Sequence, residues 1–155
     1  MSPTTLRYDE IAVGDELPEL VLPLTPTLII STAIASRDYQ DVHHDRDLAV
    51  ARGSKDIFMN ILTTNGFVGR FITDWAGPEA LLRKVDIRLG APNYPGDTMT
   101  LRGSVAEKAN GVVTIKVVGQ NELGPHVTGT VDVALPGGGA AQQREQASRP
   151  AAISG

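Results

Sequence analysis

The chain has 155 residues, which is the length of one domain and enough to bury a hydrophobic core. Its 14 Lys and Arg residues are scattered and are outnumbered by 18 Asp and Glu residues, which argues against a nucleic-acid-binding surface, because such a surface needs clustered positive charge. The sequence has no cysteine, which excludes disulfides, thiolate nucleophiles and cysteine-based metal sites.

The two ends of the chain indicate its location and its division into parts. The opening MSPTTLRYDE lacks the basic start and apolar run of a signal peptide, and no apolar stretch is long enough to span a bilayer. We therefore expect a cytoplasmic protein without membrane contact. Residues 1–17 are predicted to be an N-terminal extension and residues 18–135 one domain. Residues 136–155 are rich in Gly and Ala and lack apolar periodicity, which predicts a disordered tail.

Short elements are predicted in the first third of the domain. Residues 20–24 and 27–30 are expected to be extended segments separated by a proline. A Ser-Thr pair can then cap a short helix over residues 33–39. A second short helix is predicted over residues 46–51, closed by Gly53.

The one long segment with helical periodicity spans residues 59–76. It is predicted to be a helix with an apolar face, stopped by a Gly-Pro pair. The residues that form this face recur at spacings of three and four, as on one side of a helix. They are Phe67, Phe71 and Trp75, with Ile61, Val68 and Ile72 beside them.

Strands are predicted for most of the remaining domain, from alternation of apolar and polar residues with a period of two. Asn110-Gly111 is a strong signal for a tight hairpin turn, and residues 122–125 can form a second turn. The predicted strands are residues 81–89, 98–105, 112–118 and 127–135.

One long helix followed by antiparallel strands predicts an α+β domain. A sheet curved around one central helix is the hot-dog arrangement. A single copy leaves one sheet edge and one end of the helix uncovered, so pairing with another subunit is expected.

Ionisable residues gather in the segment DYQDVHHD, between the two short helices. Asp38 and His43 are five residues apart in a non-helical stretch, so a loop can bring both side chains into one cleft. A carboxylate and a neutral imidazole that share a water are suited to general acid–base catalysis. The alternative is structural, with Asp38 as a turn residue and His43 packed or solvated. His44 is expected to point away from its neighbour.

A metal site built from Asp41, His43, His44 and Asp45 is disfavoured, because their spacing fits neither a zinc nor an EF-hand pattern. His126 opens a predicted strand and is expected at the surface.

The same segment resembles the MaoC-like, (R)-specific enoyl-CoA hydratases of the hot-dog superfamily, and the resemblance covers residues 8–107. The family's signature is an Asp, an Asn two residues later, a Pro, and a His five residues after the Asp. Here Asp38 and His43 keep that separation, while Gln40 and Asp41 stand at the Asn and Pro positions. The stretches YDEIAVGDELPEL and RLGAPNYPGDTMTLRGSV are also typical of the family.

The chain departs from the family where the central helix begins. Family members usually carry His-Gly-Met there, and this chain has Met59-Asn60-Ile61. The resemblance implies that the backbone N–H of Asn60 binds the thioester oxygen, a role suited to the unsatisfied N–H groups at a helix N-terminus. The side chain of Asn60 is expected to crowd the space that a Gly leaves open.

A narrower resemblance covers residues 18–135 and is to the small MaoC-like subunit of actinobacterial steroid side-chain hydratases. It implies hydration of a trans-2-enoyl-CoA of a shortened cholesterol side chain, in a heterodimer or heterotetramer with a second MaoC-like chain. Asp38 is then the general base on a water that His43 also holds, and Gln40 supports Asp38. The only small molecule implied is the CoA thioester, without metal or redox cofactor.

Three other functions remain open from the sequence. A homodimeric fatty (R)-specific enoyl-CoA hydratase shares the same residues. A hot-dog thioesterase shares the fold and the CoA thioester but hydrolyses it. A non-catalytic binding subunit leaves the chemistry to its partner, although the presence of both Asp38 and His43 argues against this.

Overall fold

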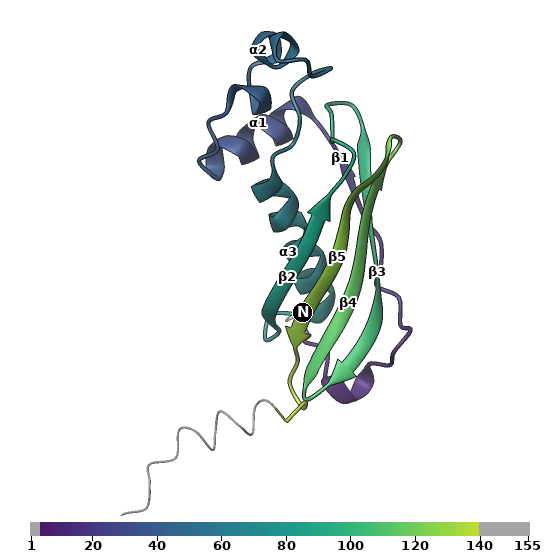
Figure 1. Cartoon of the computed structure of the whole chain (residues 1–155). Helices are drawn as coiled ribbons and strands as arrows, with labels where there is room; N and C mark the ends of the chain where they lie inside the picture. Colours follow the sequence, from purple (N-terminus) through teal and green to yellow (C-terminus); the bar gives the residue numbers. More distant parts are fainter. Residues whose placement is uncertain (1–3, 140–155) are drawn as a thin grey trace, which may run out of the picture.

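A computed structural model describes residues 4–139, and most of the predicted tail lies outside this range. The long helix α3 lies along one face of a curved sheet, while two shorter helices lie at one end of the molecule (Figure 1). The elements in chain order are η1 (Tyr8–Glu10), β1 (Leu20–Pro23), α1 (Pro26–Ala35), η2 (Asp41–His43), α2 (Arg46–Ala51), α3 (Ile61–Ala76), β2 (Leu81–Leu89), β3 (Thr98–Ala109), β4 (Val112–Asn121) and β5 (Gly124–Ala134). The predicted α+β arrangement, one helix against an antiparallel sheet, is confirmed.

The sheet has the strand order β1-β3-β4-β5-β2, and every pair is antiparallel. Its inner face packs on α3, where fully buried Val68 and Ile72 meet a core that includes Leu101, Ile115 and Val131. Burial of one such side chain stabilises the fold by about 1.5–3 kcal/mol. The helix is therefore fixed by the sheet, which holds its N-terminus in one place.

Helix α3 confirms the periodic segment, with two refinements. It begins at Ile61, because Asn60 is the N-cap and its side chain accepts a hydrogen bond from the N–H of Thr63. The buried face is centred on Val68 and Ile72, whereas Phe67 is only partly buried. Gly77 ends the helix with φ +92°, a conformation that favours glycine.

Helix α1 corrects two predictions, since residues 27–30 are not extended and the helix does not span 33–39. Thr25 accepts a hydrogen bond from the N–H of Leu28, and Pro26 occupies the first helical position. This start signal outweighs the β-branched residues that follow. The helix ends at Ala35, and Arg37 then takes φ +58°, so that the Asp38 N–H reaches the Ala33 carbonyl at 3.0 Å.

The prediction for β2 is confirmed with its exact bounds. The other three predicted strands are shorter than the strands in the structure. Residues 98–105, 112–118 and 127–135 belong to β3, β4 and β5, of which β3 and β4 run further and β5 starts earlier. Asn110 and Gly111 both have positive φ and form the predicted tight turn. Strand β2 pairs with β5 on one side only, and its Val85 remains 37% exposed.

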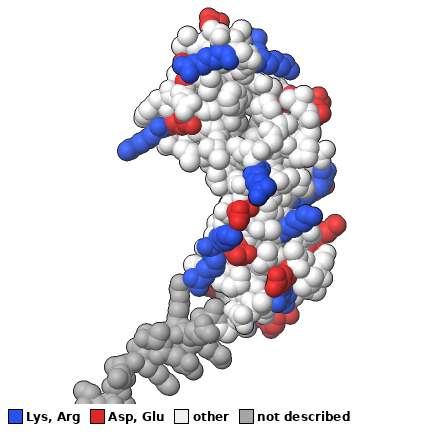
Figure 2. Space-filling model, viewed as in Figure 1, with Lys and Arg blue, Asp and Glu red and all other residues white. Residues whose placement is uncertain are grey.

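Within the described part of the chain, no strand pairs with the outer side of β2, so β2 is an edge of the sheet with unpaired backbone hydrogen-bonding groups there. Within residues 4–139, no helix has the length and apolar character needed to cross a membrane. The face shown in Figure 2 carries Lys and Arg interspersed with Asp and Glu rather than gathered by sign.

Candidate active site

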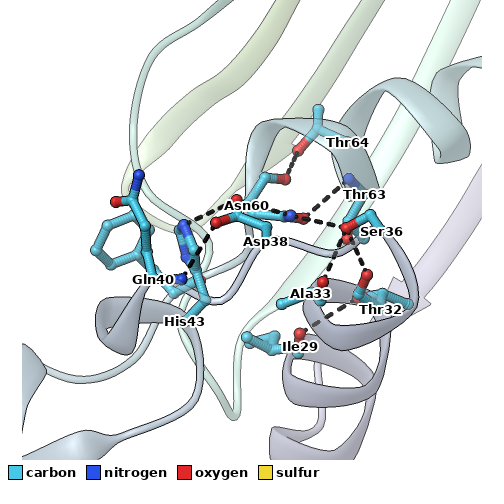
Figure 3. Close-up of polar contacts among 11 residues, drawn as sticks. Ile29, Thr32, Ala33, Ser36, Asp38, Gln40, His43, Asn60, Thr63 and Thr64 are labelled. Atoms are coloured by element: carbon cyan, nitrogen blue, oxygen red, sulfur yellow. Dashed lines mark hydrogen bonds and ion pairs between the residues drawn. The ribbon is translucent and has the colours of Figure 1, made fainter.

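Asp38 and His43 come together at the end of the molecule that holds α1 and α2. Asp38 follows the C-terminus of α1, and His43 is the last residue of the 3-10 turn η2. The turn folds the chain back, so that His43 Nε2 lies 3.4 Å from Asp38 Oδ2. Both side chains are largely shielded from water, since 8% of the His43 side chain and 16% of the Asp38 side chain are exposed. Figure 3 shows Asp38 between His43 and Asn60.

The imidazole of His43 is held in one orientation. Its Nδ1 lies 2.7 Å from the carbonyl oxygen of Phe58, and the Phe58 ring meets it edge-on with centroids 4.9 Å apart. A carbonyl oxygen only accepts hydrogen bonds, so Nδ1 carries the hydrogen. In the neutral ring, Nε2 is therefore an acceptor that faces Asp38.

Asp38 is stabilised as a carboxylate. Asn60 Nδ2 donates to Asp38 Oδ2 at 3.0 Å, and the N–H of Gln40 donates to Oδ1 at 3.4 Å. The hydrogen bond from Asn60 lowers the pKa of Asp38 below its ordinary value; the N–H of Gln40 acts in the same direction, and burial opposes both. Two acceptors, the Asp38 carboxylate and the Nε2 lone pair of neutral His43, thus lie 3.4 Å apart.

Asn60 contacts Asp38 through its side chain, a contact that sequence reasoning missed. The side chain points toward Asp38 and Ser36, while its Oδ1 caps α3. An Asn directly before an apolar periodic segment is an N-cap signal, which indicates this position but not the partner of the amide nitrogen. The contact from Gln40 to Asp38 is made by its backbone N–H.

A groove of about 360 Å³ lies beside this cluster, between α1 and α3. Ser36 and Thr63, both bonded to Asn60, form part of its wall. Thr63 Oγ1 is buried and has no hydrogen-bond partner among the described residues. The remaining wall is largely apolar and includes Gly66 and Phe67. Asp38 and His43 do not line the groove, which can therefore hold an apolar group beside Ser36 and Thr63.

The histidine outside this cluster corrects a prediction. His126 is 2% exposed and not at the surface, because β5 begins earlier than predicted and the register shift opposite Gly119 and Gln120 turns the ring into the core. Its Nδ1 lies 2.7 Å from Ala91 O, its Nε2 lies 2.8 Å from Thr64 Oγ1, and burial lowers its pKa.

The four residues weighed as a metal site diverge. Asp41 forms an ion pair with Arg52 at 2.7 Å, and Asp45 caps α2 by accepting from the Leu48 N–H. Among residues 4–139, no three His, Asp or Glu side chains are placed to hold a metal ion together.

In sequence and fold, the chain is similar to known hydratases. The chain is 58% identical over 123 residues to the 3-oxo-4,17-pregnadiene-20-carboxyl-CoA hydratase beta subunit of Mycobacterium tuberculosis. The aligned region covers 79% of this chain and 95% of that protein. No protein-family model matches the chain.

Solved structures show the same hot-dog fold. A chain of the ChsH1-ChsH2 complex from Mycobacterium tuberculosis matches with a TM-score of 0.79 and 58% identity, over 80% of this chain and 98% of that chain. The R-hydratase PhaJ1 from Pseudomonas aeruginosa matches with the same TM-score of 0.79 and 21% identity, over 87% and 88%. A fluoroacetyl-CoA thioesterase shares the fold more distantly, with a TM-score of 0.59 and 12% identity, over 90% of this chain and 100% of that one.

Proposed function

The chain belongs to the MaoC-like hydratase family, and we propose that it is the catalytic subunit of a heteromeric enoyl-CoA hydratase. The proposed substrate is a steroid trans-2-enoyl-CoA, in which the shortened side chain of cholesterol forms the CoA thioester. The observation that carries the proposal is the shielded Asp38–His43 pair, 3.4 Å apart, in a chain 58% identical to a steroid-thioester hydratase subunit.

The pair is suited to activating water. Asp38 and the Nε2 of neutral His43 are both acceptors, so one water molecule can donate a hydrogen to each and direct its lone pair outward. The water oxygen forms a bond to C3, and the π electrons of the C2–C3 bond move toward the thioester carbonyl. Asp38 takes one proton from the water, and this proton then returns to C2, which completes the addition of H and OH.

Negative charge develops on the thioester oxygen during this step and needs a donor. Asn60 lies at the N-terminus of α3, and its N–H makes no hydrogen bond to another residue of the described range. A free N–H at the positive end of a 16-residue helix favours an oxyanion. The buried Thr63 hydroxyl, beside the same helix end, is a second available polar group.

The groove between α1 and α3 has the size and the largely apolar lining to bind a bulky apolar acyl group. Gly66 lines it, and a Cβ built on Gly66 meets no atom within 4 Å, so the wall is open at this point. Leu62 and Arg70, two exposed residues of α3, also line the groove. We assign it to the acyl part of the substrate.

A second MaoC-like chain is the proposed partner, in a heterodimer or heterotetramer. The free edge of β2 bears apolar side chains that a second sheet can cover, namely Leu81, Leu82, Val85 and Leu89. Ile61 and Leu62, on the first turn of α3, are exposed as well. The structure 58% identical to this chain is that of a ChsH1-ChsH2 complex. The proposed location is the cytoplasm.

The test follows the loss of enoyl-thioester absorbance with a steroid enoyl-CoA and with crotonyl-CoA. The protein is assayed alone and after co-purification with a candidate MaoC-like partner, with Asp38→Asn as the inactive control. Turnover of the steroid thioester only with the partner is expected. Turnover of crotonyl-CoA by the chain alone would favour a homodimeric fatty-acyl hydratase. Release of free CoA would favour a thioesterase. Full activity of Asp38→Asn would favour a non-catalytic role for this chain.

A further inference from the structure

The side-chain amide of Asn60 has a fixed orientation. Its Oδ1 accepts a hydrogen bond of 3.0 Å from the N–H of Thr63, which can only donate. The nitrogen Nδ2 therefore lies on the opposite side, and the flip of the amide is determined by this bond. Asn60 is 1% exposed, so water does not compete for either atom.

Both hydrogens of Nδ2 are used. One is donated to Asp38 Oδ2 and the other to Ser36 Oγ, each at 3.0 Å. Ser36 Oγ in turn donates to the Thr32 carbonyl at 2.7 Å, so its oxygen is free to accept from Asn60. The amide thus links the end of α1 to the start of α3, with Asp38 between them (Figure 3).

We propose that Asn60 is a positioning residue, whose side-chain amide holds the Asp38 carboxylate ionised and directed at His43. This inference rests on the proposed function for its effect on turnover. The oxygen bonded by Asn60 is the one that faces His43 Nε2 at 3.4 Å, so the amide fixes the atom that must accept a proton from water. A glycine at position 60 has no group that can do this.

Two substitutions separate positioning from helix capping. Asn60→Ser and Asn60→Asp both retain a good N-cap oxygen, so α3 keeps its start signal. Both remove the amide donor from Asp38, and Asn60→Asp also places a second carboxylate beside it. A like charge raises the pKa of a carboxyl group. The matched control is Asn65→Asp, which makes the same charge change on α3 at a residue whose amide bonds only the Ile61 carbonyl.

The first readout is the pH dependence of kcat/KM for the chain co-purified with its partner. Asp38 must be ionised to act as a base, so activity is lost as pH falls through its pKa. We expect the acidic limb to move to higher pH in Asn60→Ser and further in Asn60→Asp. At neutral pH, kcat falls by about 10- to 100-fold, the factor for one hydrogen bond to a charged group, with little change in KM. Asn65→Asp keeps the wild-type profile.

The second readout needs no turnover. The side-chain carboxyl of Asp38 is titrated by ¹³C NMR in the full chain, with Asp38→Asn used to assign its resonance. A higher titration midpoint in both Asn60 variants, absent from Asn65→Asp, supports the inference. This holds even if the wild-type protein hydrates neither thioester, because that lack of turnover would remove only the proposed function. An Asp38 midpoint unchanged by Asn60→Ser and Asn60→Asp would overturn the positioning role.

Discussion

The Nε2 atom of His126 lies 2.8 Å from Thr64 Oγ1, and this hydrogen bond joins β5 to α3 inside the core. The Nδ1 atom lies 2.7 Å from the Ala91 carbonyl, so Nδ1 carries the hydrogen and Nε2 accepts from the threonine hydroxyl. A neutral ring thus satisfies both partners. Burial lowers the pKa of His126 below its ordinary value of 6.5, while the bond to Ala91 opposes the change.

The buried ring predicts a loss of stability in mild acid. The folded state has the lower His126 pKa, so the unfolded state binds the proton first as pH falls below 6.5. The free energy of unfolding is then highest above 6.5 and falls as pH drops toward the folded-state pKa. Urea unfolding across this range measures the slope. His126→Gln should be less stable at neutral pH by about 1–2 kcal/mol, with a flatter slope. An equal slope in both proteins would contradict this assignment.

His43 and His44 give a matched pair of substitutions. His43→Ala removes the Nε2 acceptor beside Asp38 and should lower kcat by at least about 100-fold, within the range for a general acid–base group. His44→Ala removes the same kind of side chain one residue later and should retain activity. The measurement is kcat for the thioester hydrated by wild-type protein, with thermal unfolding as a check on folding. Equal losses in the two variants would remove the specific role of His43.

Gly66 predicts a switch in substrate size. A Cβ meets no atom within 4 Å there, so Gly66→Ala should stabilise α3 by about 0.5–1 kcal/mol. Gly66→Leu fills the groove beside Ser36 and Thr63. The KM of the Gly66→Leu variant for a steroid enoyl-CoA should rise by at least about 10-fold, the scale of a poorly fitted apolar group. Any turnover of crotonyl-CoA serves as the reference. A steroid KM unchanged in Gly66→Leu would place the acyl group elsewhere.

Val85 tests the free edge of β2 as the surface that meets the partner. The residue is 37% exposed, so Val85→Asp leaves the fold of the chain intact while placing a charge at the edge. Co-purification with the MaoC-like partner should be lost. Val21→Asp is the control, since Val21 is 53% exposed on β1, at the opposite edge of the sheet. Loss of the complex in Val21→Asp alone would place the interface at the β1 edge.

The sequence by itself determined the elements whose signals are local and mutually consistent. The apolar period of three to four residues predicts α3, and the period of two predicts β2 with its observed limits. Asn110-Gly111 predicts the turn between β3 and β4, because both residues tolerate positive φ. The interval of five between Asp38 and His43 is also a sequence property, and a short loop is enough to bring the two together.

Only the tertiary structure decided features that depend on distant neighbours. His126 is buried because a shift in strand register turns it inward, which no local pattern encodes. Residues 27–30 are helical because burial of Ile29 in the core, added to the local Thr25-Pro26 start signal, outweighs their β propensity. The amide of Asn60 reaches Asp38, 22 residues away in sequence, because α1 and α3 pack together and place the end of one helix beside the start of the other.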